Sequence, residues 1–251
     1  MQPSVITGTV PSLAAVYAVW IVAGVLTLFG ALIAAELASA YPRTGGVYVF
    51  LREAFSPGLA FLWGWAMFWT MHTGIIAAIA MVFARYASYF VPVGDLGTKM
   101  LAVAAVIVLS AVNYVGVKPG AVVQTTITII KVGAILAIIA VAFLVGPHGT
   151  AAVATAQPAR NIPASAFGLA LVAGLFAFGG WHMVTYAAEE TREPERTIPR
   201  ALTIGVVLVT LCYIALNAAY FHVLSPDVIA KSTRVAADAA DVVLGRDGAT
   251  I

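Results

Sequence analysis

The chain has 251 residues, of which 62% are hydrophobic and 10% charged, and its formal net charge at pH 7 is +2. A soluble domain has about 25% charged residues, so this composition excludes an ordinary soluble protein and indicates an integral membrane protein. The small net charge and the scattered basic residues give no reason to expect a nucleic-acid partner. A single cysteine, Cys212, provides neither a disulfide framework nor a Cys/His metal spacing.

Six apolar runs follow one another along the chain, and each is near or above the length of about 20 residues that an α-helix needs to cross a membrane. Strands of a membrane β-barrel alternate in units of about ten residues, and these runs do not alternate. We therefore predict an all-α integral membrane protein with a single transmembrane domain over residues 1–251. The predicted helices cover residues 13–38, 58–90, 100–117, 121–145, 165–188 and 201–223.

Basic residues in the loops predict how the chain is oriented in the plasma membrane. They gather in the loops after the first, third and fifth runs, while the intervening loops hold only Lys99 and Arg160. Since cytoplasmic loops are enriched in lysine and arginine, the first set of loops is expected in the cytoplasm. The first ten residues and the tail from Ser225 are then expected on the opposite side. The cytoplasmic set is Arg43, Arg52, Lys118, Arg192, Arg196 and Arg200.

Lys131 is the most unusual residue within a predicted span. It lies about ten residues from either end of its run, a depth of about 15 Å at the helical rise. A buried ammonium group at that depth costs at least about 2.5 kcal/mol, so it should face a polar partner or a water-filled cavity. Two interpretations stay open. Lys131 is either a structural cation that holds helices together, or a group that titrates a proton or replaces a coupling sodium ion.

The segment FAFGGWHMV, residues 176–184, interrupts an apolar run with two adjacent glycines. Small residues in membrane helices often allow close helix packing, and that explanation remains open for Gly179 and Gly180. The flanking aromatic residues Phe176, Phe178 and Trp181 favour a second explanation, a break near residues 177–181 that exposes backbone groups to a substrate. The aromatic side chains would then cover the opened backbone.

Two polar features follow the glycine pair. His182 is either a packed, hydrogen-bonded histidine or a contact of the substrate. The segment AAEETREPERTIPRA, residues 187–201, alternates four glutamates with three arginines. It is expected to be a solvated, mutually paired loop, with intracellular gate contacts as the alternative.

Three long motifs resemble the amino acid–polyamine–organocation superfamily, particularly its L-amino-acid transporter group and the bacterial permeases related to it. FAFGGWHMVTYAAEETREPERTIPRAL resembles the family's sixth helix, and ALIAAELASAYPRTGGVYVFLREAFSPGLAFLWGW resembles its second helix and the start of its third. VNYVGVKPGAVVQTTITIIKVGAILAI is similar to the passage from the fourth helix to the fifth and places Lys131 at the family's fifth-helix lysine.

The resemblance implies a LeuT-type fold of inverted repeats, present in part from the outer half of the first helix, over residues 3–12, through the seventh. It implies that opened backbone at Phe176, Ala177 and Gly179 binds the amino group of the substrate. Trp181 and His182 match positions near the side-chain pocket, so that the expected substrate site is Phe176, Ala177, Phe178, Gly179, Gly180, Trp181 and His182. The chain is expected to be a fragment that holds half of this site.

The resemblance further implies secondary active transport of amino acids by alternating access, independent of sodium, with Lys131 as the coupling residue in exchange or proton symport. The open alternatives are a polyamine permease and a helix bundle or subunit that does not transport.

An intramembrane enzyme is not expected, because the predicted spans lack paired acids, a histidine cluster or a Ser/His pair. No cofactor or metal is predicted. The expected partners are an amino acid and membrane lipid, while an accessory subunit and self-association are left open.

Overall fold

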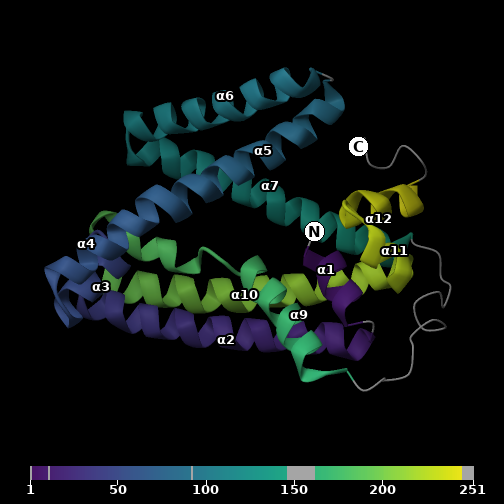
Figure 1. Ribbon diagram of the computed structural model, residues 1–251, viewed down its shortest axis with the longest axis horizontal. Helices are drawn as coiled ribbons and strands as arrows, with labels where there is room; N and C mark the ends of the chain where they lie inside the picture. The colour runs from purple at the N-terminus through teal and green to yellow at the C-terminus, as the bar shows by residue number, and fades with distance from the viewer. Residues whose placement is uncertain (1, 11, 92, 146–161, 245–251) are drawn as a thin grey trace. The chain divides into compact units, whose positions relative to one another are not determined.

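The computed structural model describes residues 2–10, 12–91, 93–145 and 162–244, so that Arg160 and the end of the tail lie outside the described residues (Figure 1). In these ranges the regular elements are all helices. Their bounds are α1 Gln2–Thr9, α2 Leu13–Ala40, α3 Val47–Ala54, α4 Pro57–Ala66, the π-helix η1 Met67–His72, α5 Thr73–Phe90, α6 Gly94–Val115, α7 Val117–Leu144, α9 Ala164–Ala177, the 3-10 helix η2 Trp181–Glu190, α10 Pro194–Val223, α11 Pro226–Lys231 and α12 Val235–Leu244.

Six helical stretches within the described ranges are long and apolar enough to cross a membrane. Their positions agree with the six apolar runs of the sequence, and the prediction of an all-α membrane protein is confirmed. Large apolar side chains on these helices are exposed, as expected for a surface that contacts lipid. The six stretches are Leu13–Ala40, Pro57–Ser88, Gly94–Val115, Lys118–Leu144, Ala164–Glu190 and Pro194–Val223.

The chain divides into two compact units. The first unit holds Met1–Val47 and Gly133–Ile251, and the second holds Tyr48–Val132. In the first unit α2 packs along α10, and α9 packs against both α1 and α2 (Figure 1). The buried core of this unit draws side chains from all of these helices, and it includes Ile6, Val19, Trp20, Ala170, Phe178, Phe221 and Ile229.

The second unit contains α3 to α6 and the first half of α7. The long second span is not a uniform α-helix, because the π-helix η1 separates α4 from α5. The helix α5 packs along α6, and the hydroxyl groups of Ser88 and Thr98 lie 2.8 Å apart between them. Short π-helical segments inside α-helices are uncommon, and sequence periodicity gave no indication of this one.

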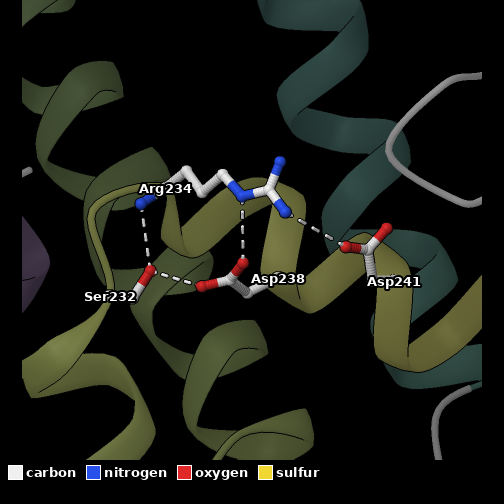
Figure 2. Close-up of polar contacts among 4 residues, drawn as sticks. All are labelled: Ser232, Arg234, Asp238 and Asp241. Carbon is white, nitrogen blue, oxygen red and sulfur yellow. Dashed lines mark hydrogen bonds and ion pairs between the residues drawn. The ribbon is translucent and has the colours of Figure 1, made fainter. Parts of the chain in front are cut away.

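Two short helices, α11 and α12, follow the last span. The helix α11 packs against α1, and α12 packs against α10. Figure 2 shows Arg234 directed toward the two carboxylates of α12, with Nε 3.4 Å from Asp238 and Nη2 3.9 Å from Asp241. The Ser232 hydroxyl donates to Asp238 at 2.5 Å and accepts from the backbone N–H of Arg234 at 3.0 Å. This network fixes the turn between the two helices.

The last span begins well before its apolar run. The helix α10 starts at Pro194, so that Glu195, Arg196 and Arg200 lie in its first turns and not in the loop that the charge pattern indicated. Proline suits the first helical turn because its missing N–H has no partner there, and Glu195 interacts favourably with the positive end of the helix. Pro194 and Glu195 therefore favour a helix start that lies before the membrane-spanning residues.

Candidate functional site

The fifth span is interrupted between α9 and η2. The helix α9 ends at Ala177, η2 begins at Trp181, and the three residues between them form a turn. Gly180 has φ 97° and ψ −9°, a left-handed conformation that residues with a side chain rarely adopt. The interruption lies within the segment for which the glycine pair led us to expect a break.

The turn leaves several backbone groups open. The N–H of Gly179 donates to the Phe176 carbonyl at 3.1 Å, and the N–H of Met183 donates to the Gly180 carbonyl at 3.0 Å. In the part of the chain that the structure describes, the carbonyls of Phe178 and Gly179 and the N–H groups of Gly180 and Trp181 form no backbone hydrogen bond. Unpaired backbone groups are costly at membrane depth, so they favour contact with water or a polar ligand.

Tyr213 of α10 contacts the end of α9. Its hydroxyl donates to the Ala177 carbonyl at 2.9 Å. Its ring centroid lies 5.1 Å from that of Phe178 and 5.1 Å from that of Trp20 on α2. Trp20 and Phe178 are both buried. This aromatic cluster, defined by Trp20, Phe178 and Tyr213, holds the interrupted helix against α2 and α10.

We expect Tyr213→Phe to keep the aromatic cluster and to remove the hydrogen bond to the Ala177 carbonyl. A part-buried carbonyl that loses its donor costs about 1 to 3 kcal/mol, so the solubilised protein should unfold at a lower temperature. The matched control is Tyr114→Phe, because Tyr114 is 94% exposed on α6. Equal unfolding temperatures for the two variants, measured by intrinsic fluorescence, would show that the Tyr213 hydroxyl does not stabilise the break.

The predicted substrate residues occupy different environments. Phe178 is 6% exposed, whereas Phe176 is 73% exposed, so the two phenylalanines do not form one cover over the turn. The Trp181 ring makes an edge contact with the His182 ring, with centroids 5.6 Å apart and planes at 83°. His182 in turn contacts the ring of Tyr186 at 6.0 Å. Residues 178–182 therefore present open backbone next to a line of aromatic rings.

The middle of η2 contacts the turn after α2. A Cβ atom added at Gly46 would lie 2.5 Å from Thr185 Oγ1 and 2.5 Å from Tyr186 Cδ1. Thr185 is buried, and its hydroxyl donates to the His182 carbonyl at 2.7 Å. Glycine at position 46 therefore allows the close approach of η2 to the turn after α2.

The charged segment after η2 is only partly a loop. Arg196 pairs with Glu193 at 3.7 Å, and both side chains are largely exposed. The Ser39 hydroxyl at the end of α2 lies 3.1 Å from the backbone carbonyl of Glu195. The Ser39 contact joins the end of α2 to the start of α10 on the side predicted to be cytoplasmic.

Lys131 lies on α7 in the second unit, and its side chain is exposed. Within the described ranges, no group of three or more His, Cys, Asp or Glu side chains is arranged so that it could hold a metal ion. The candidate site is built from backbone groups and aromatic rings.

Comparison with known proteins identifies a family and several relatives of this chain. A family model described as "Amino acid permease" matches residues 3–251. The chain is 35% identical to the b(0,+)-type amino acid transporter 1 of Oryctolagus cuniculus, over 90% of this chain and 47% of that protein. It is 33% identical to the serine/threonine exchanger SteT of Bacillus subtilis, over 91% and 52%. It is 32% identical to the human cystine/glutamate transporter, over 90% and 46%. The chain thus spans about half the length of these relatives.

Proposed function

This chain belongs to the amino acid permease family, and from that premise we propose that the complete protein moves amino acids across the membrane as a secondary transporter. Transport proceeds by alternating access, in which the substrate site opens to one side of the membrane at a time. The six candidate spans and the similarity to transporters and exchangers support this proposal.

The observation that carries the proposal is the opened backbone between α9 and η2. The carbonyls of Phe178 and Gly179, which accept no backbone hydrogen bond in the described ranges, offer acceptors for the ammonium group of an amino acid. The N–H groups of Gly180 and Trp181, at the start of η2, offer donors for a carboxylate, and the positive end of a helix favours an anion there. Interrupted membrane helices place such groups at the substrate sites of transporters.

The seven residues proposed for the site differ in how they contribute. The carbonyls of Phe176 and Ala177 already accept hydrogen bonds from Gly179 and Tyr213, so each would use its second lone pair for a substrate. Trp181 and His182 present rings beside the open backbone, and we assign to them the side chain of the substrate. The Phe178 ring is buried in the aromatic cluster and supports the site from behind.

Uptake into liposomes tests the proposed transport directly. The complete protein is reconstituted, and uptake of labelled amino acids is measured with and without an internal unlabelled amino acid, a pH gradient or sodium. We expect uptake that does not require sodium and that depends either on the internal amino acid or on the pH gradient. A correctly folded protein that takes up no amino acid under any of these conditions would contradict the proposal and favour a helix bundle that does not transport.

We further propose that Lys131 couples substrate uptake to amino acid exchange or to proton movement. We expect Lys131→Ala to reduce uptake driven by an internal amino acid or a pH gradient at least about tenfold, equivalent to about 1.4 kcal/mol. Arginine keeps the charge but does not release its proton, so Lys131→Arg separates a structural charge from proton transfer. Retained uptake in Lys131→Arg would favour the structural role. Lys118→Ala is the control, because Lys118 is an exposed lysine of the same helix outside the apolar run. Uptake by Lys131→Ala equal to that of the control would exclude Lys131 from the mechanism.

A further inference from the structure

Gly30 of α2 lies directly against the ring of Trp181. A Cβ atom added at Gly30 would lie 2.9 Å from Cζ2 and 3.1 Å from Cη2 of the indole. Carbon atoms in good contact are about 3.5 to 4.0 Å apart, so even a methyl group at this position would force the ring to move. The Trp181 ring therefore occupies the space that a side chain at position 30 would need.

Glycine at position 30 has no other evident reason. It lies in the interior of the regular helix α2, where alanine would be more favourable, and its backbone does not have a positive φ. The close approach of the indole is the contact that glycine allows here. Position 30 is therefore linked to the placement of one ring on the interrupted span.

The Trp181 ring contacts α2, and its backbone directly follows the break. Gly180 before it is left-handed, and Trp181 is the first residue of η2. The residue is only partly buried, so part of the ring is uncovered. Since Trp181 directly follows the open backbone groups of the break, a ring pushed off α2 can reach the space beside that backbone.

We propose that Gly30 is a specificity-determining residue: by letting the Trp181 ring lie against α2, it leaves room beside the break for an amino acid with a large side chain. A larger residue at position 30 displaces the ring into that room and selects for small amino acids. This inference rests on the proposed function, because it assigns a size limit to the same substrate site.

The test is competition for uptake in liposomes by large amino acids, leucine and phenylalanine, and by small ones, alanine and serine. For Gly30→Ala we expect the ratio of the inhibition constants, large over small, to rise about tenfold. Trp181→Phe lacks Cζ2 and Cη2, so adding Gly30→Ala to that variant should change the ratio less than about twofold, which is the coupling that a double-mutant cycle detects. Gly205→Ala on α10 is the control, because a Cβ atom there meets nothing within 4 Å.

An unchanged ratio of inhibition constants in Gly30→Ala would overturn this inference and leave the proposed function standing. A loss of uptake that is equal for all four amino acids and is not relieved by Trp181→Phe would do the same. If Gly30→Ala does not reach the membrane, the double variant is compared with Trp181→Phe. Failure of both Gly30→Ala proteins to fold would assign Gly30 to stability and would overturn the inference as well. Absence of uptake by the unchanged protein would instead overturn the proposed function, and the size limit with it.

Discussion

Replacing Gly180 with alanine is expected to weaken amino acid binding by at least about tenfold, equivalent to about 1.4 kcal/mol. The reason is backbone strain, because Gly180 has φ 97° and a Cβ atom built there meets nothing within 4 Å. Holding an alanine in such a conformation costs about 1 to 3 kcal/mol. The strain is relieved if residue 180 turns right-handed, which would join α9 to η2 and pair the carbonyls that the substrate needs. Substrate affinity is measured from the concentration dependence of uptake.

Two control variants separate this effect from general damage. Gly94→Ala adds the same kind of strain, since Gly94 has φ 68° and open space around it, but it lies at the start of α6 in the second unit. It should lower the unfolding temperature and leave the affinity unchanged. Asparagine tolerates left-handed backbone better than alanine, so Gly180→Asn should retain more affinity than Gly180→Ala. Equal affinities for Gly180→Ala and the unchanged protein would refute a role for the break in binding.

Local sequence signals were sufficient to predict the six candidate spans and the segment in which the fifth span is interrupted, between α9 and η2. Apolar runs of membrane length predicted the six candidate spans, because a helix that faces lipid must satisfy its backbone internally and cover it with apolar side chains. The pair Gly179 and Gly180 indicated the interrupted segment for a related reason, since glycine weakens a helix at its own position. Both signals act within a few residues of the structure that they specify.

The surroundings of the break depend on contacts between distant parts of the chain. Tyr213 reaches the Ala177 carbonyl from α10, and Gly30 meets Trp181 from α2. Neither residue stands out in its own helix, because a tyrosine or a glycine in an apolar run has many ordinary explanations. A single sequence carries no record of which helix faces are in contact, so these partners became visible only in the folded chain.

Charge patterns predicted an orientation in the membrane, and they were wrong about one helix boundary. The run of glutamates and arginines after the fifth span looked like a loop, yet Glu195, Arg196 and Arg200 belong to α10. Glutamate and arginine are good helix formers, and the proline at position 194 starts the helix. Low hydropathy therefore marks where the membrane-spanning residues end and not where the helix ends.

Replacing Gly46 with alanine is expected to destabilise the protein more than the same change at any glycine with open space around it. The added methyl group would collide with Thr185 Oγ1 and with the Tyr186 ring, both 2.5 Å from its position. Neither neighbour can move freely, because Thr185 is buried and hydrogen-bonded to the His182 carbonyl, and the Tyr186 ring contacts the His182 ring. Overpacking of this kind costs about 1 to 3 kcal/mol. Thermal unfolding in detergent measures the effect.

Gly94→Ala again serves as the matched control, since Gly46 and Gly94 have φ 49° and 68° and only Gly46 has close neighbours. The difference between the two variants therefore isolates the collision from the backbone strain. A methyl group at Gly46 pushes on the same 3-10 helix whose first residues form the proposed site, so transport should also lose affinity in this variant and not in the control. If Gly46→Ala and Gly94→Ala lower the unfolding temperature equally, the contact between the turn after α2 and η2 does not stabilise the protein.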